Sequence, residues 1–412
     1  MGSFRGCAIG LATLALALAG CGGDDGNGGA AGNSGEPLKI GAMNPYSGDF
    51  ALYGTELLRG YQLAADEANA HGGVLGRQVE LLRGDAIAAD QAIAEAQRLA
   101  TQENVDAFTG TYVSAVSQAA SDVAAQQNKL YWETNALAGD LTDRKLPNFI
   151  RVGPNSDDFA QVSVDVMEPI AESLGKSVGE LTVYIEHEDS IYGTSIARVQ
   201  RRLLEEAGAT VAAVGSHDAA ATDLTDSVLR ARSAKPDVWL VTGYVPDGNL
   251  LLRTARSQGF DPPARAMVGT GDTSETLEAI GEEGLEGVFV VSYPRADISE
   301  EYGPGSDDFL AAYKEKYGRE PLAPQTMTAY SGMKVLFEVL EEAGSTEPEA
   351  VREAAAGMSQ PANSLATGYG VEFDDTFQNT LAEPVVIQWQ SGKQITVFPE
   401  QAAGSNQFVE GR

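Results

Sequence analysis

The amino-acid sequence predicts an α/β protein with two doubly wound, Rossmann-like lobes joined by a hinge. Short apolar runs alternate with amphipathic stretches from Leu38 onward, and a length of 412 residues suits two domains better than one. Alternation of this kind indicates parallel sheets that are covered by helices on both faces. A break near residues 154–158 separates the two lobes. A single eight-fold barrel is the structural alternative.

The first apolar run, residues 38–42, predicts a buried strand, and a helix follows at about 55–69. That helix has an apolar stripe at three- and four-residue spacings and ends at Gly72-Gly73, where glycine can adopt the left-handed conformation. Further strands are expected at 78–83, 105–109, 130–132, 149–152, 181–186, 211–216, 238–242, 266–269 and 288–292. Helical stretches lie between most of them, at 89–102, 116–127, 191–207 and 249–257.

The N-terminal segment is typical of a secretory signal. Arg5 precedes an apolar stretch of residues 8–19, which is too short to span a bilayer and ends in Leu-Ala-Gly-Cys21. This ending resembles a bacterial lipobox, so we expect a signal peptide at 1–20 and a lipid anchor on Cys21. The small-residue segment 21–36 predicts a flexible linker. An ordinary cleaved signal with an incidental cysteine is the alternative.

Composition excludes several classes of function. The chain has 28 basic and 59 acidic residues, a net charge of −31, which disfavours nucleic acid and adhesion of the folded body to an anionic membrane. With two cysteines, Cys7 and Cys21, no disulfide framework is available. The three histidines form no HExxH motif, and neither a nucleophile elbow nor a phosphate-binding loop occurs. We therefore expect no enzyme activity, no metal and no cofactor.

Six loops that follow predicted strands are rich in polar, aromatic or glycine residues. In open parallel sheets, ligands bind beyond the carboxyl ends of the strands. If the two lobes face each other, all six loops can line one binding site. The loops are residues 43–54, 110–117, 133–140, 187–193, 243–248 and 269–274.

Several motifs together resemble one known family. They are IGAMNPYSGD from Ile40, Tyr53-Gly54, a helix end NAHGGVLG closing at Gly76, SAVSQ from Ser114, HEDSIYG from His187, GYVPD from Gly243 and LRTARSQG from Leu252. In this order and spacing, the chain is similar to periplasmic amino-acid-binding proteins. The resemblance is greatest to the branched-chain (Leu/Ile/Val) amino acid binding proteins of ABC importers.

The resemblance implies a type I periplasmic-binding fold. We expect lobe 1 at 37–153 and 292–376, lobe 2 at 154–291 and 377–400, and a C-terminal tail at 401–412. It also implies an extracytoplasmic, membrane-anchored monomer that captures a small solute by hinge closure and delivers it to permease subunits. The ligand would be a branched-chain-like amino acid, an amide or a small acid. A ligand-sensing module of the same fold that feeds a signalling partner is the alternative.

The resemblance also assigns the site residues. Ser114 lies where the family binds an α-carboxylate, with Ser117 nearby and the loop of Ala136 and Ala138 adding donors; a plain helix cap is the alternative for Ser114. Asp272 lies where similar proteins hold an amino group, or else it caps the following helix. Glu133 is a second acidic candidate, or a solvated loop charge. The family's aromatic positions, which close over the ligand, are those of Tyr53, Tyr192 and Tyr244.

Overall fold

The computed structural model describes residues 35–404 and residue 408. The expected signal peptide and Cys21 lie outside the described residues. So do residues 21–34 of the expected linker and most of the expected tail. The chain from Gly35 onward forms one compact unit. In the described part of the chain, no helix is long and apolar enough to cross a membrane.

The first sheet has five parallel strands in the order β2-β1-β3-β4-β5. Ile40 in the interior strand β1 pairs with Leu81 on one side and with Ala107 on the other. The strands are β1 (Leu38–Asn44), β2 (Val79–Asp85), β3 (Ala107–Gly110), β4 (Leu130–Glu133) and β5 (Phe149–Arg151). Their apolar runs are buried because helices cover both faces, as a parallel sheet requires.

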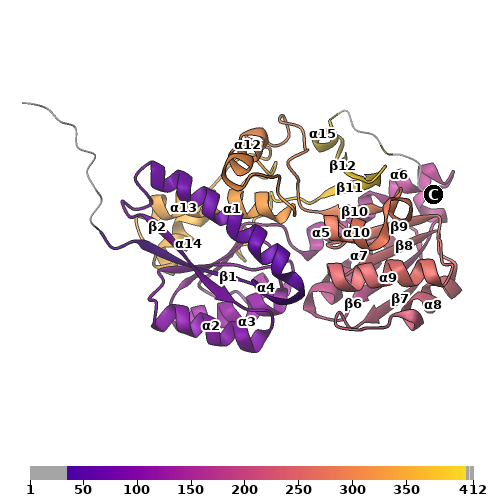
Figure 1. Ribbon diagram of the computed structural model, residues 1–412, viewed down its shortest axis with the longest axis horizontal. Coiled ribbons are helices and arrows are strands. Elements are labelled where there is room, and N and C mark those ends of the chain that lie inside the picture. The colour runs from indigo at the N-terminus through magenta and orange to yellow at the C-terminus, as the bar shows by residue number, and fades with distance from the viewer. Residues whose placement is uncertain (1–34, 405–407, 409–412) are drawn as a thin grey trace, which may run out of the picture. The chain divides into compact units, whose positions relative to one another are not determined.

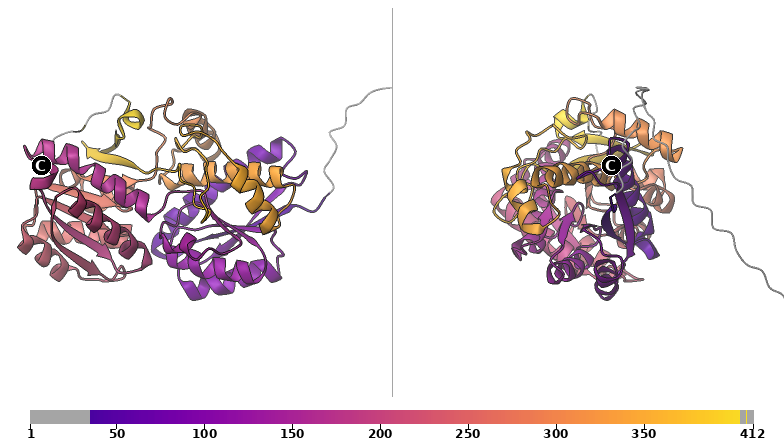
Figure 2. Two further views of the ribbon diagram at one scale, coloured as in Figure 1. Left: turned by 180° about the vertical axis from the view of Figure 1, so that it is seen from behind. Right: turned by 90° about the vertical axis from the view of Figure 1, so that its left-hand side faces the viewer.

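The helices of this first lobe come from two distant parts of the chain. Helices α2 and α3 pack together on one face, and α1 packs against α13 on the other. Figure 1 and Figure 2 show α12, α13 and α14 beside this sheet, although they follow the second sheet in sequence. Their bounds are η1 (Gly48–Phe50), α1 (Ala51–Ala70), α2 (Ala89–Thr101), α3 (Ser114–Gln126), α4 (Asp140–Asp143), α12 (Ser306–Tyr317), α13 (Gln325–Ala343) and α14 (Pro348–Gly357).

The second sheet has seven strands in the order β12-β11-β10-β9-β8-β6-β7. They are β6 (Thr182–Glu188), β7 (Thr210–His217), β8 (Val238–Thr242), β9 (Ala264–Val268), β10 (Phe289–Ser292), β11 (Val385–Gln390) and β12 (Lys393–Phe398). Its helices are α5 (Ser156–Asp165), α6 (Met167–Ser173), η2 (Val178–Glu180), α7 (Ile191–Glu206), α8 (Thr225–Ala234), α9 (Val245–Ser257), α10 (Ser274–Ile280), α11 (Glu282–Leu285) and α15 (Glu400–Ala403).

The two sheets confirm the predicted α/β class with two parallel-sheet lobes, and a strand is present at each expected position. One edge of the second sheet differs from the expectation of parallel strands. There β11 runs antiparallel to β10, and β12 antiparallel to β11. Ser391 and Gly392, both at positive φ, join β11 and β12 in a two-residue hairpin turn that makes this arrangement possible.

Candidate functional site

Five aromatic rings from both lobes form a contact group, which we call the inter-lobe aromatic cluster. Tyr53 stacks on Tyr112 with ring centres 4.2 Å apart, and Tyr244 lies 5.0 Å from both Phe50 and Tyr192. Tyr112 and Tyr244 join the two halves of the cluster at 5.7 Å. Each ring follows the carboxyl end of a strand, and the cluster brings together four of the six loops that were expected to meet, residues 43–54, 110–117, 187–193 and 243–248.

Asp272 lies at the edge of this cluster and is buried. Its Oδ1 accepts a hydrogen bond from the Tyr53 hydroxyl at 2.9 Å, which joins the lobes. Its Oδ2 accepts from Ser292 at 2.7 Å and from the Gln325 amide at 3.4 Å. Helix α10 has Thr273 as its N-cap, so Asp272 does not cap it. In the described part of the chain, every hydrogen-bond partner of this carboxylate is neutral.

Ser114 is the first residue of α3, and the N-cap of that helix is Val113. Ser114 is therefore not a helix cap. The Ser114 Oγ accepts a hydrogen bond from the Ala138 backbone N–H at 3.2 Å. Its hydroxyl hydrogen therefore remains able to donate. Backbone N–H groups in the first turn of a helix carry partial positive charge, so this corner suits an anionic group.

Glu133 is fully buried rather than solvated, and it takes the donors that were expected to serve a ligand. Its Oε2 accepts from the Ser117 hydroxyl. Its Oε1 accepts from four backbone N–H groups, those of Thr111 at 2.6 Å and of Thr134, Asn135 and Ala136 at 2.9 Å each. Burial raises the pKa of Glu133 to about 7, although these hydrogen bonds oppose the shift.

Several polar atoms near Asp272 and the loop after β4 are buried without a hydrogen-bond partner in the described residues. They include both side-chain atoms of the Asn135 amide, the Gln325 Oε1 and the Thr273 Oγ1. A buried polar group left unpaired costs about 1–3 kcal/mol. A bound polar solute would supply the missing partners. Sequence reasoning missed Phe50 and Gln325, although Phe50 lies in a loop that the sequence singled out.

A buried histidine supports one wall of the aromatic cluster. The His217 Nδ1 lies 3.0 Å from Glu186 Oε1, and its Nε2 lies 2.9 Å from Asp247 Oδ2. The other oxygen of Asp247 accepts from the backbone N–H of Tyr244 at 3.0 Å, at the start of α9. Burial lowers the pKa of His217, but the hydrogen bonds to Asp247 and Glu186 outweigh it and raise the pKa to about 9.

This arrangement predicts a loss of stability in mild alkali. A histidine whose folded pKa exceeds its unfolded value stabilises the fold fully below about pH 6.5, and that stabilisation is lost as pH rises through the folded pKa. We expect the unfolding free energy to fall by about 2 kcal/mol between pH 7 and pH 9, and by slightly more at higher pH. Urea unfolding measures it. The His217→Ala variant should lack this slope, and His71→Ala, which alters an exposed histidine, should keep it.

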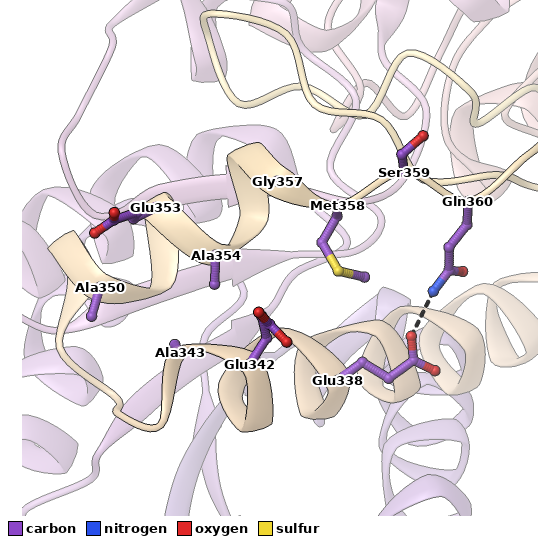
Figure 3. Close-up of a pocket in the computed structure, with 10 residues that line it drawn as sticks. All are labelled: Glu338, Glu342, Ala343, Ala350, Glu353, Ala354, Gly357, Met358, Ser359 and Gln360. Carbon is purple, nitrogen blue, oxygen red and sulfur yellow. Dashed lines mark hydrogen bonds between the residues drawn. The ribbon is translucent and has the colours of Figure 1, made fainter.

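A separate surface cavity of about 720 Å³ lies between α13 and α14 (Figure 3). Glu338, Glu342 and Glu353 line it together with small and apolar residues, and the Gln360 amide donates to Glu338 Oε2 at 2.6 Å. None of its lining residues belongs to the aromatic cluster or to the candidate site. The cavity is therefore distinct from the site between the lobes.

Comparison with known proteins gives a consistent result. A family described as "Periplasmic binding protein" matches residues 37–393. The Leu/Ile/Val-binding protein homolog 7 of Brucella suis biovar 1 (strain 1330) is 38% identical over 368 residues, which cover 89% of this chain and 92% of that protein. Homolog 8 of Brucella abortus (strain 2308) is also 38% identical, over 89% of this chain and 91% of its own.

Two solved structures share the fold. The branched-chain amino acid transporter substrate binding protein LivJ of Streptococcus pneumoniae, in complex with isoleucine, has a TM-score of 0.73 and 22% identity, covering 88% of this chain and 100% of its own. A solute binding protein of R. palustris in complex with 4-hydroxybenzoate has a TM-score of 0.76 and 19% identity, covering 88% and 95%. These likenesses confirm the type I periplasmic-binding fold.

Proposed function

This chain belongs to the periplasmic binding protein family, and on that premise we propose that it captures a zwitterionic, amino-acid-like solute between its lobes for delivery to an ABC importer. The family consists of solute-binding proteins without enzyme activity, so the expectation of no enzyme is confirmed. Of the two solved structures described above, one holds an amino acid and the other an aromatic acid. The ligand class of this chain must therefore be inferred from its own site.

The carboxylate of Asp272 is the observation that carries the proposal. A buried carboxylate with only neutral partners is costly, and a cationic ligand group would offset that cost. The electron-rich tyrosine rings of the inter-lobe aromatic cluster, which lie beside Asp272, also favour a cation nearby. An ammonium group beside Asp272 and a carboxylate beside Ser114 at the start of α3 make the ligand a zwitterion. A simple aromatic acid has no cationic group that could pair with the carboxylate of Asp272.

The test is a panel of candidate solutes measured by thermal shift on the purified protein. We expect aliphatic amino acids to raise the melting temperature and benzoate and 4-hydroxybenzoate to leave it unchanged. At a hundredfold excess over the dissociation constant, a ligand adds about 2.7 kcal/mol of stability. A rise with the aromatic acids alone would contradict the proposed ligand class.

We further propose that the protein is anchored by lipid outside the cytoplasmic membrane. The sequence before Gly35 fits a signal peptide followed by lipid attachment at Cys21 and a flexible linker. Several acyl chains anchor a protein stably where a single chain does not. The tethered protein would then present its loaded form to permease subunits outside the cytoplasmic membrane.

A further inference from the structure

The loop of residues 134–138 lies between two buried ionisable side chains, Glu133 and Arg151. On one side, the Glu133 carboxylate collects the backbone N–H groups described above. On the other side, the guanidinium of Arg151 in β5 donates from Nη1 to the carbonyl oxygens of Ala136 at 3.0 Å and of Ala138 at 2.8 Å. The peptide groups of one short loop are therefore held through their N–H groups by the carboxyl group of Glu133 and through their carbonyls by the guanidinium of Arg151.

Burying both of these ionisable side chains lowers the stability of the fold unless another role compensates for the cost. Glu133 and Arg151 are both fully buried, and removing a charge from water costs several kcal/mol unless close partners compensate. Burial lowers the pKa of Arg151 to about 10, and the charge of Glu133 opposes that shift. The guanidinium therefore stays ionised at neutral pH.

The loop carries groups that belong to the proposed site or contact it. Its Ala138 N–H orients the Ser114 hydroxyl, and the side-chain amide of Asn135 is buried without a partner in the described residues. A shift of the loop would move both. Backbone N–H groups that converge on one point form an anion-binding concavity. Here the chain fills that concavity with its own carboxylate.

Arg151 also connects the loop to a segment that crosses between the lobes. Its Nε donates to Gln378 Oε1, and the Gln378 amide donates to the carbonyl of Gly153 at 2.8 Å. The backbone N–H of Asn379 donates to the Arg151 carbonyl at 2.9 Å. The loop is thereby fixed to the same framework that joins the two sheets.

We propose that Glu133 is a built-in hydrogen-bond acceptor which, with Arg151, holds the 134–138 loop in its ligand-binding form, so that both are positioning residues for solute capture. This inference rests on the proposed function, because the loop matters for capture only if the solute binds between the lobes. The carboxylate supplies acceptor oxygens that no other described side chain supplies to these N–H groups. A small free carboxylate should therefore replace it.

The test compares Glu133→Ala with Glu133→Gln, using L-leucine as the probe and calorimetry for affinity. We expect Glu133→Ala to bind at least about tenfold more weakly, since the N–H groups of Thr111, Asn135 and Ala136 lose their acceptor, while that of Thr134 keeps the Gly110 carbonyl at 3.1 Å. Glu133→Gln keeps an acceptor oxygen at the same place and should stay within about threefold of the parent. Sodium acetate should restore the affinity of Glu133→Ala, and methylammonium chloride at equal ionic strength should not. Neither salt should strengthen binding to the parent or to Glu133→Gln.

A second readout needs no ligand. Hydrogen exchange of the amides of residues 134–136 should be faster in Glu133→Ala, and acetate should slow it again. Parent-like affinity and exchange in Glu133→Ala, or no response of either to acetate, would overturn the inference. If Glu133→Ala does not fold, a Glu133→Gln variant with strongly weakened binding would overturn it instead. If the parent protein does not bind L-leucine, the proposed ligand class fails, while hydrogen exchange still decides the role of Glu133.

Discussion

Replacing Asp272 by asparagine should weaken the binding of an amino-acid ligand by about 30- to 150-fold, or about 2–3 kcal/mol. The change keeps the shape of the side chain and removes its charge, so an ammonium group loses its counter-ion in a water-poor site. Without ligand, the variant should be as stable as the parent or more stable, because Asp272 has only neutral partners there. Calorimetry and urea unfolding measure the two effects separately.

Two further variants isolate the role of the Asp272 charge. Asp261→Asn makes the same change in net charge on an exposed side chain and should leave affinity unaltered. Tyr53→Phe removes one hydrogen bond to Asp272 but keeps the ring stacked on Tyr112, so its effect should be within about fivefold. Unchanged amino-acid affinity in Asp272→Asn would remove the ammonium from this position. Tighter binding of benzoate by the variant would support the electrostatic explanation.

The sequence predicted the strands well because their signal is local. Continuous apolar runs of four to eight residues are typical of buried parallel strands, and the expected strand positions are all occupied. The antiparallel edge could also have been predicted. Ser391-Gly392 lies between two runs of alternating apolar residues, and such a local pattern is typical of a β-hairpin.

Helix starts were predicted less well, for an identifiable reason. The N-caps of α1, α3 and α9 are Phe50, Val113 and Tyr244, none of which has a side chain typical of a cap. These helices therefore begin two to four residues before the expected positions. As a result, Tyr53 and Ser114 lie in first helical turns rather than in loops.

The resemblance proposed residues for the site but could not predict the contacts that each one makes. Ser117 and the loop of Ala136 were expected to serve a ligand, yet the Ser117 hydroxyl and the Ala136 N–H both donate to Glu133. Nothing local to residue 133 reveals this, because the partners come from β3, α3 and the following loop. The role of Arg151 also could not be predicted from the short strand β5, because its side chain contacts Gln378 and the Ala136 carbonyl, which are distant in the sequence or in another element.

Replacing Gly60 by alanine should destabilise the protein by about 2–3 kcal/mol, because α1 and α13 touch at this point. A Cβ at residue 60 would lie 2.3 Å from the Thr326 carbonyl oxygen, 2.9 Å from the Ala329 Cβ and 3.0 Å from the Tyr330 nitrogen. Two of these atoms are helical backbone, which cannot move away singly. The helices must separate, and urea unfolding should report the cost.

The same separation should also weaken ligand binding, because the two helices carry groups at Asp272. Tyr53 lies in α1 and Gln325 begins α13, and both donate to that carboxylate. Gly357→Ala is the matched control: it is also a helical glycine, and a Cβ there meets no atom within 4 Å. It should leave affinity unchanged and stability equal or higher by up to about 1 kcal/mol. If Gly60→Ala lost stability but kept full affinity, the α1–α13 contact would not help to place the donors of Asp272.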